Sequence, residues 1–123
     1  MQWIIVAIGG ALGALCRYGI TQLLPPGTHG FPWATWWANV SGSLLIGLCY
    51  VVIVDKGLIA EQWRPLLMVG FLGALTTFSS FALDAFLLWQ QGQVYISLIY
   101  TVSSVITCLL AVALTIQVLQ RLL

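Results

Sequence analysis

The sequence predicts an all-α membrane protein with four transmembrane helices. Its 123 residues are 61% hydrophobic and only 6% charged, whereas a soluble domain contains about 25% charged residues. The mean hydropathy is +1.05, and the apolar residues form four runs that each reach the roughly 20 residues needed to cross a bilayer. We expect spans at about residues 3–24, 33–54, 64–89 and 94–119, within one transmembrane domain of residues 1–123.

The scarcity of charged and catalytic residue types excludes several classes of function. The formal net charge is only +1, so the chain offers no basic surface to a nucleic acid. His29 is the only histidine and the three cysteines stand alone, so neither a metal cluster nor a disulfide framework is expected. The sequence contains no paired carboxylates, nucleophile–base set or phosphate-binding loop. We therefore expect a protein that is not an enzyme.

The first span, at about residues 3–24, combines small residues with one charge. Gly9 and Gly13 are four residues apart, a spacing that lets two membrane helices approach closely. Arg17 lies inside the span, where a cation is costly and usually faces a partner or a water-filled cavity. Because the loop at Pro25 is near, the Arg17 side chain could equally extend to the membrane surface.

The second span, at about residues 33–54, carries a small polar face. Three tryptophans gather at its start, where an interfacial aromatic belt belongs. Asn39, Ser43 and Gly47 recur every four residues and therefore share one face of the helix. The Asn39 amide can both donate and accept hydrogen bonds, so it suits either an interhelical contact or an ion pathway.

The third span, at about residues 64–89, contains the stretch GFLGALTTFSSF at Gly70–Phe81. Glycines and neighbouring hydroxyl residues weaken a helix, and irregular backbone at membrane depth is tolerated only beside protein or a water-filled cavity. We therefore expect a broken third helix whose break is the working site. Broken membrane helices often direct carbonyls at a bound cation, and Gly73 and Thr76 could present such carbonyls. The role of the acidic Asp84, just after the stretch, is open.

The remaining polar groups suit a small, strongly hydrated anion. Phe78 and Phe81 lie roughly on one helix face, and the positive edge of an aromatic ring attracts an anion without holding it tightly. Conduction needs sites that an ion can both enter and leave readily. Packing in the core or against lipid is the alternative role for these two rings. The neutral donors available to an anion are Asn39, Ser80, Tyr100 and Ser104.

Few charges specify the orientation of the spans. Lys56, Arg64 and Arg121 lie on the side of the two termini, which favours cytoplasmic termini by the positive-inside rule. The excess is thin and Arg17 lies towards the opposite face, so insertion in both orientations is possible. Four helices alone enclose a pore poorly, and we also expect oligomerisation.

Three stretches carry a family resemblance that covers the whole chain. They are GGALGALCRY at residues 9–18, WANVSG at 37–42 and GFLGALTTFSSF at 70–81. Together, in this order, they resemble the Fluc (CrcB-type) fluoride channels of bacteria. The resemblance implies an antiparallel, dual-topology homodimer in the lipid bilayer of the bacterial plasma (inner) membrane, with two pores that each use both subunits. It also implies passive, fluoride-selective export of cytoplasmic fluoride, which reduces fluoride toxicity.

The resemblance implies pore roles for single residues. Asn39 is similar to the family's pore asparagine, and Phe78 and Phe81 are similar to its paired pore phenylalanines. Tyr100 and Ser104 are similar to the start of a polar track on the fourth span.

Other residues match family positions outside the pore or depart from them. Gly73 and Thr76 are similar to the residues whose backbone carbonyls bind a structural sodium ion at the two-fold axis of the dimer. Arg17 is similar to a first-span arginine near an anion vestibule. The chain departs from the pattern at Cys108, where a hydroxyl would continue the polar track, because a thiol is a weaker donor.

An alternative is a small multidrug-resistance-type, proton-coupled exporter, which also has four short spans. That chemistry needs a carboxylate deep in the membrane, typically in the first span, to exchange protons for a cationic drug. The first span here holds Arg17 and no acidic residue, which counts against it. A small accessory membrane subunit is a third class, and it would produce no ion flux by itself.

Overall fold

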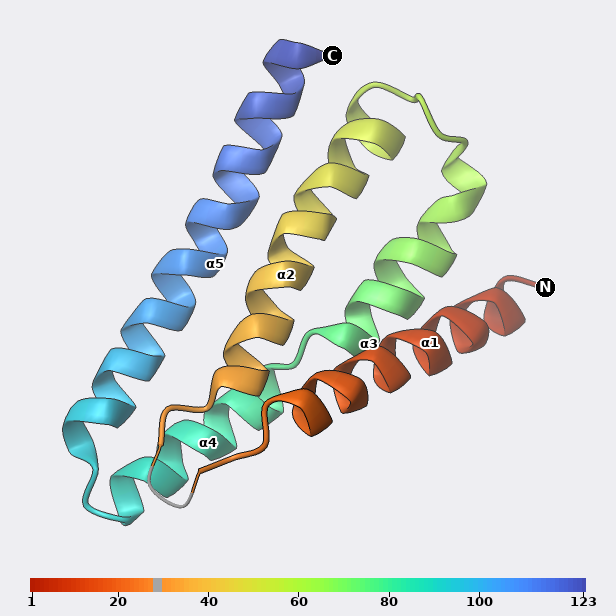
Figure 1. The fold of residues 1–123 in the computed structure, drawn as a ribbon. Coiled ribbons are helices and arrows are strands. Elements are labelled where there is room, and N and C mark those ends of the chain that lie inside the picture. Colours follow the sequence, from red (N-terminus) through yellow and green to blue (C-terminus); the bar gives the residue numbers. More distant parts are fainter. Residues whose placement is uncertain (28–29) are drawn as a thin grey trace.

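A computed structural model of the chain describes residues 1–27 and 30–123, and all regular structure in these two ranges is helical. Figure 1 shows the elements in chain order. Their bounds are α1 (Gln2–Leu23), α2 (Trp33–Cys49), η1 (Tyr50–Asp55), η2 (Glu61–Trp63), η3 (Pro65–Leu72), α3 (Gly73–Leu75), α4 (Phe78–Gln90) and α5 (Val94–Leu122). The elements η1 and η3 are π-helical, and η2 is a 3₁₀ turn. His29 lies outside the described residues.

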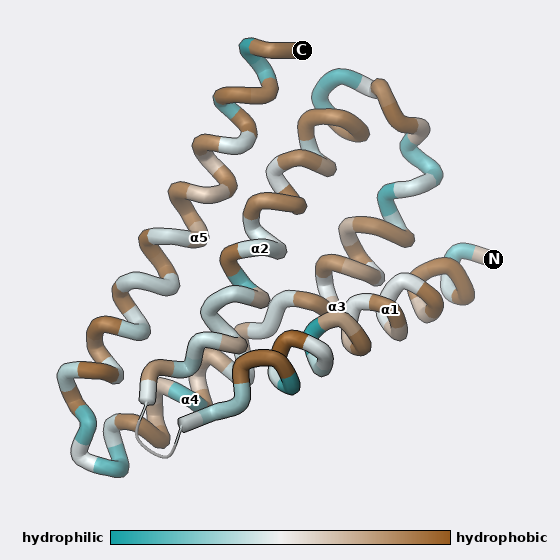
Figure 2. Tube along the Cα trace, in the orientation of Figure 1, coloured by the Kyte–Doolittle hydropathy of each residue, from teal (hydrophilic) through white to brown (hydrophobic). Residues whose placement is uncertain are grey.

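Four helical runs of the described chain are long and apolar enough to cross a membrane, which confirms the predicted fold class. They are Gln2–Leu23, Trp33–Asp55, Glu61–Gln90 and Val94–Leu122. Figure 2 shows hydrophobic residues along these runs and hydrophilic residues mainly at the connections and near the chain ends. Most large apolar side chains are exposed, as expected for helices whose surroundings are lipid rather than water.

A close contact joins α1 to η3, and it is built from glycines. A Cβ atom on Gly9 would overlap the carbonyl oxygen of Leu66, and one on Gly13 would overlap the carbonyl oxygen of Phe71. From the other side, a Cβ atom on Gly70 would lie 3.1 Å from the Cα atom of Gly9. We call this contact the glycine seam. It lets two backbones meet directly, because association in lipid depends on close van der Waals packing.

The helix α5 packs against α2. Gly47 of α2 is buried, and a Cβ atom there would lie 3.1 Å from Cβ of Thr115 on α5. Where the two runs end, Nε2 of Gln120 donates a hydrogen bond to Oδ2 of Asp55 at 3.2 Å. The C-terminus and the connection from η1 to η2 share this end of the molecule, and the other two connections lie at the opposite end (Figure 1).

The third run changes its backbone conformation between α3 and α4. Thr76 (φ −84°, ψ 156°) and Thr77 (φ −152°, ψ 124°) are extended, so α3 ends at Leu75 and α4 begins at Phe78. We call Thr76–Thr77 the extended segment. Beyond it, α4 leaves the direction of η3 and lies beside the first part of α5 (Figure 1). The extended segment thus connects α3, which packs on α1, to α4, which packs on α5.

Candidate functional site

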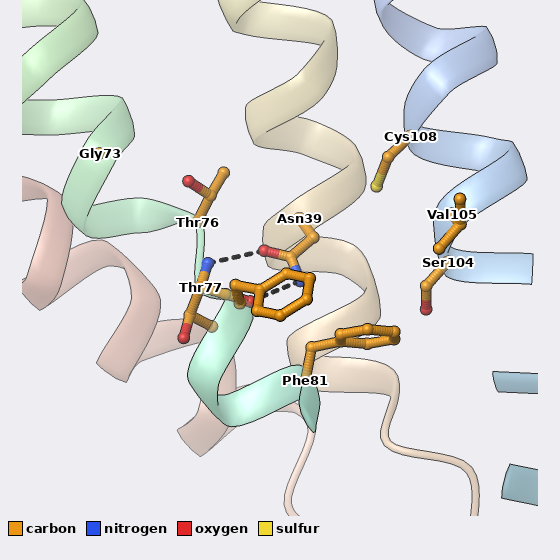
Figure 3. A pocket seen from close by; sticks show the side chains of 9 residues that line it. Asn39, Gly73, Thr76, Thr77, Phe81, Ser104, Val105 and Cys108 are labelled. Atoms are coloured by element: carbon orange, nitrogen blue, oxygen red, sulfur yellow. Dashed lines mark hydrogen bonds between the residues drawn. The ribbon is translucent and has the colours of Figure 1, made fainter. Parts of the chain in front are cut away.

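The side chain of Asn39 holds the extended segment against α2. Its Nδ2 donates to the carbonyl oxygen of Thr77 at 3.0 Å, and its Oδ1 accepts from the Thr77 N–H at 2.7 Å (Figure 3). An amide nitrogen carries two N–H donors, so one donor of Asn39 is not used by this pair. Gly42 gives the segment room, because a Cβ atom there would overlap Cγ2 of Thr76.

This arrangement removes the helical partners of two backbone carbonyls. In a continuous α-helix the carbonyl of residue i accepts from the N–H of residue i+4. The Thr77 N–H donates to Asn39 instead, so the Gly73 carbonyl loses that partner. The Ser80 N–H donates to Oγ1 of Thr77 at 3.1 Å as an N-cap contact, so the Thr76 carbonyl loses its partner too. Two neutral oxygen acceptors therefore lie close together along the chain.

A third carbonyl at this point, that of Ala74, is paired with α1. Nε of Arg17 donates to it at 3.0 Å. A hydrogen bond from an ionised donor is shorter and stronger than a neutral one, and this one ties the side chain of Arg17 to the protein interior. Of the two interpretations of Arg17 as a membrane-embedded charge, the structure thus supports the internal partner over extension to the membrane surface.

A cavity of about 370 Å³ opens beside the extended segment, and we call it the central cavity. Its lining residues are Asn39, Gly73, Thr76, Thr77, Phe78, Phe81, Ser104, Val105 and Cys108. In Figure 3 the residues of α5 face Asn39 and the threonines across this space. None of these described lining residues is charged. The cavity therefore offers hydrogen-bonding groups and aromatic rings without a fixed charge.

The two phenylalanines of the cavity differ in exposure. Their ring centroids are 5.6 Å apart with an interplanar angle of 56°. Phe81 is half-buried, and its ring packs on that of Tyr100 at a centroid distance of 5.3 Å. Phe78 is 79% exposed. A ring so exposed at the start of a helix has little packing within one copy of the chain.

Ser104 places an unpaired hydroxyl in the central cavity. The residue is only 5% exposed, and its Oγ has no hydrogen-bond partner among the described residues. Leaving a buried polar group unsatisfied costs about 1–3 kcal/mol. Native structures usually pair such groups with protein or ordered water, so the Ser104 hydroxyl is a candidate partner for water or a ligand.

Tyr100 points its hydroxyl away from this lining. Its OH donates to Oδ2 of Asp84 at 3.1 Å, and Oγ1 of Thr35 donates to the same oxygen at 2.8 Å. Tyr100 is completely buried. The carboxylate of Asp84 is thus held by two hydroxyl donors from α2 and α5, a contact that joins three helices behind Phe81.

The structure gathers most of the predicted site residues but not all of them. Those that line the central cavity are Asn39, Gly73, Thr76, Phe78, Phe81 and Ser104. Those outside its lining are Arg17, Ser80 and Tyr100.

Three further contacts are not predicted from the sequence. They involve Thr77, the Ala74 carbonyl and Thr35. Thr77 carries a usable signal, since a hydroxyl residue directly before a helical run is a favoured N-cap. Ala74 acts through its backbone, which no side-chain pattern reveals. Thr35 pairs with an acid 49 residues away, so its partner has no signature in local spacing.

Comparison with known proteins places the chain among related sequences. The family described as "CrcB-like protein, Camphor Resistance (CrcB)" matches residues 4–116. This match covers nearly the whole chain and extends from the first to the last of the four helical runs that could cross a membrane.

Several curated relatives are similar along most of their length. One from Saccharophagus degradans is 46% identical over 120 residues, which cover 98% of this chain and 90% of the relative. One from Hahella chejuensis is 47% identical over 111 residues, covering 89% and 87%. One from Aeromonas salmonicida is 50% identical over 92 residues, covering 73% of each. All three relatives are named "Fluoride-specific ion channel FluC".

Proposed function

Since the chain belongs to the CrcB-like family, whose members are fluoride ion channels and not enzymes, we propose that it conducts fluoride selectively and passively. Flow out of the cell then exports cytoplasmic fluoride and reduces its toxicity. The chain is a multi-pass protein of the bacterial inner membrane, as its apolar helices and its family both indicate. The observation that carries the proposal is the central cavity, with an unpaired hydroxyl and two aromatic rings but no charged lining residue.

The chemistry of the cavity suits transient binding of fluoride. A small, strongly hydrated anion must exchange water for other donors, and the Ser104 hydroxyl lacks a partner in the described chain. The ring edges of Phe78 and Phe81 carry partial positive charge. Since conduction requires that an ion also leave, neutral donors serve better here than a fixed cation would.

Further groups extend the proposed pathway beyond these three residues. One N–H of Asn39 is not used in its contact with Thr77 and can donate to an anion in the cavity. We assign Ser80 and Tyr100 to the pathway outside the cavity lining. Ser80 contributes its hydroxyl, and Tyr100 contributes the ring that packs on Phe81, because its hydroxyl donates to Asp84. Arg17 is assigned to an anion vestibule on the α1 side, where its guanidinium retains donors beyond the Nε that binds Ala74.

The pathway needs a second copy of the chain. Phe78 is 79% exposed and Gly73 is also exposed, so the central cavity opens onto a face that one copy does not cover. We propose an antiparallel homodimer in which each copy closes the cavity of the other, giving two pores. The thin charge asymmetry of the connections fits a chain that inserts in both orientations.

We further propose that the third span is a broken helix in the bilayer and that its break binds a structural sodium ion. The freed carbonyls of Gly73 and Thr76 are the ligands, and neutral backbone oxygens of unwound helices are known sodium ligands in membrane proteins. These two carbonyls are suitable sodium ligands because each has lost its helical hydrogen-bond partner. One copy supplies too few oxygens to enclose the ion, so a site on the dimer two-fold axis, with both copies contributing, is the arrangement we favour.

Ion efflux from liposomes tests the proposed function. The purified protein, as the only protein present, should release fluoride and retain chloride, while protein-free liposomes retain both. Equal release of the two halides would contradict selectivity. Exchange of protons for a cationic drug would instead favour the small multidrug-resistance-type exporter, for which α1 offers no acidic residue.

Removal of sodium tests the cation site separately. Dialysis into a potassium buffer should shift the dimer towards monomer or slow fluoride efflux, and returned sodium should restore both. Size-exclusion chromatography and the efflux assay provide the two measurements. Indifference of both to sodium would argue against the site at Gly73 and Thr76.

A further inference from the structure

We propose that Cys108 makes the central cavity a binding site for soft, thiophilic metal ions, and that an ion bound there blocks fluoride conduction. This inference rests on the proposed function, because it assigns the block to the same anion pathway. It concerns a feature specific to this chain, a free thiol among the hydroxyl and aromatic groups of the cavity.

The thiol opens into the cavity. Cys108 lies on α5, four residues after Ser104, and is half-buried. In Figure 3 its sulfur points from α5 into the space that faces Asn39. The other two cysteines, Cys16 and Cys49, are also free thiols, but neither belongs to the described lining. Of the three, Cys108 is therefore the thiol that shares a space with the proposed anion pathway.

A second observation, on Ser104, points to a ligand in this space. The Ser104 hydroxyl lines the same cavity, is buried, and lacks a hydrogen-bond partner among the described residues. Such a group needs water or a ligand as a partner. The Cys108 thiol lies one helical turn from Ser104 on the same face of α5, and both residues line the cavity.

The thiol of Cys108 favours soft metal ions. A cysteine sulfur prefers soft metals, whereas Mg²⁺ and Ca²⁺ prefer carboxylate and carbonyl oxygens. The described lining contains no carboxylate or imidazole, so Cys108 is its one strong ligand for a soft ion. A metal held there lies in the cavity that Val105 and Phe81 also line, which is the space that fluoride crosses in the proposed pathway.

Mercuric chloride is a suitable probe because its reaction with a thiol is simple. The Sγ–H bond of Cys108 breaks and an Sγ–Hg bond forms. One chloride leaves the mercury, and the proton and chloride pass to the solvent. No electron is transferred, so the reaction needs no oxidant, and an excess of dithiothreitol reverses it by competing for the metal.

Two complementary variants isolate the thiol. The first carries Cys16→Ser and Cys49→Ser, which leaves Cys108 alone, and the second carries only Cys108→Ser. Each is placed in liposomes, and its fluoride efflux after mercuric chloride is compared with its own untreated rate. We expect efflux of the first variant to fall about tenfold or more, because a fixed metal obstructs a single-file site. Dithiothreitol should restore it, and the second variant should be insensitive.

Intact mass spectrometry of the same samples reports binding without reference to flux. The first variant should gain one mercury atom per chain. The inference is overturned if that variant carries no mercury, if it carries mercury and still conducts, or if Cys108→Ser is blocked as strongly as the natural chain. Absence of fluoride efflux before any mercury is added would instead refute the proposed function, and the mass would still decide whether the thiol binds the metal.

Discussion

The two sides of the third helical run differ in how far one copy of the chain completes them. On the α1 side, the glycine seam buries Gly9 and Gly13 against the backbone of η3, with no room for even a Cβ atom. On the α5 side, the central cavity stays open, Phe78 is 79% exposed and the Ser104 hydroxyl lacks a partner. The α1 side is therefore fully packed within one copy of the chain, whereas the α5 side is not.

The difference teaches where structure and function are separable in this molecule. The backbone contacts of the glycine seam need no further partner, and they stabilise the fold through van der Waals packing. Unpaired hydroxyls and carbonyls, in contrast, gain a hydrogen-bond or ion partner only when a ligand or a second chain binds. Changes in the glycine seam should therefore cost stability, whereas changes in the central cavity should cost ion flux first.

The largest effect should come from Gly13→Val in the glycine seam. The new side chain overlaps the carbonyl oxygen of Phe71, and relief requires α1 to move away from η3. We expect a loss of about 3 kcal/mol of stability, measured as a fall in the melting temperature and loss of the folded peak in detergent. Gly19→Val is the control on the same helix, because a Cβ atom there has no neighbour within 4 Å. Similar melting of both variants would show that the seam is not tight.

The next effect should come from Phe78→Ile in the central cavity. It removes a ring edge from the proposed pathway, so we expect fluoride efflux to fall about tenfold, which corresponds to about 1.4 kcal/mol of barrier. The melting temperature should stay near that of the natural chain, since the ring is mostly exposed. Phe86→Ile, also on α4 and 59% exposed but outside the cavity lining, should conduct normally. Full conduction by Phe78→Ile, and by the matching Phe81→Ile, would exclude the rings from the pathway.

The variant Asn39→Leu should lower both stability and fluoride efflux, because Asn39 holds the extended segment and also lines the central cavity. The change deletes both hydrogen bonds to the backbone of Thr77, at a cost of about 2 kcal/mol. It should also slow fluoride efflux, since the extended segment then loses its position beside the cavity. Ser41→Ala is the control, because the Ser41 hydroxyl bonds only to Ala38 of its own helix. Normal stability together with normal efflux in Asn39→Leu would rule out this role of the amide.

The smallest effect should come from Thr77→Val. It removes the N-cap of α4, in which Oγ1 accepts from the Ser80 N–H, and a cap contributes about 1 kcal/mol. We expect a small fall in melting temperature and only a minor change in efflux. Thr21→Val is matched to it, since the Thr21 hydroxyl bonds to Tyr18 within α1 and caps nothing. An equal response of the two threonines would mean that the cap does not hold α4.

Much of the fold could be predicted because the bilayer leaves few choices. For an apolar run of spanning length, the helix is the arrangement that satisfies the backbone groups internally, and the third run departs from it only at Thr76–Thr77. The small-residue spacing at Gly9 and Gly13 likewise indicated a close helix contact, and η3 provides it. Family membership follows from the chain as well, since the match covers residues 4–116. The fluoride pathway, the sodium site and the antiparallel dimer stay predictions.

By itself, then, the sequence determined the fold class, the four spans and the family, since composition and local spacing carry that information. Only the tertiary structure decided how the extended segment is held. Its partners are far away in sequence: Asn39 binds Thr77 across 38 positions, and Arg17 binds the carbonyl of Ala74 across 57. Such pairs depend on which helix faces meet, and helix periodicity states only which residues share a face. A carbonyl acceptor is moreover common to every residue, so packing alone selects the one that is used.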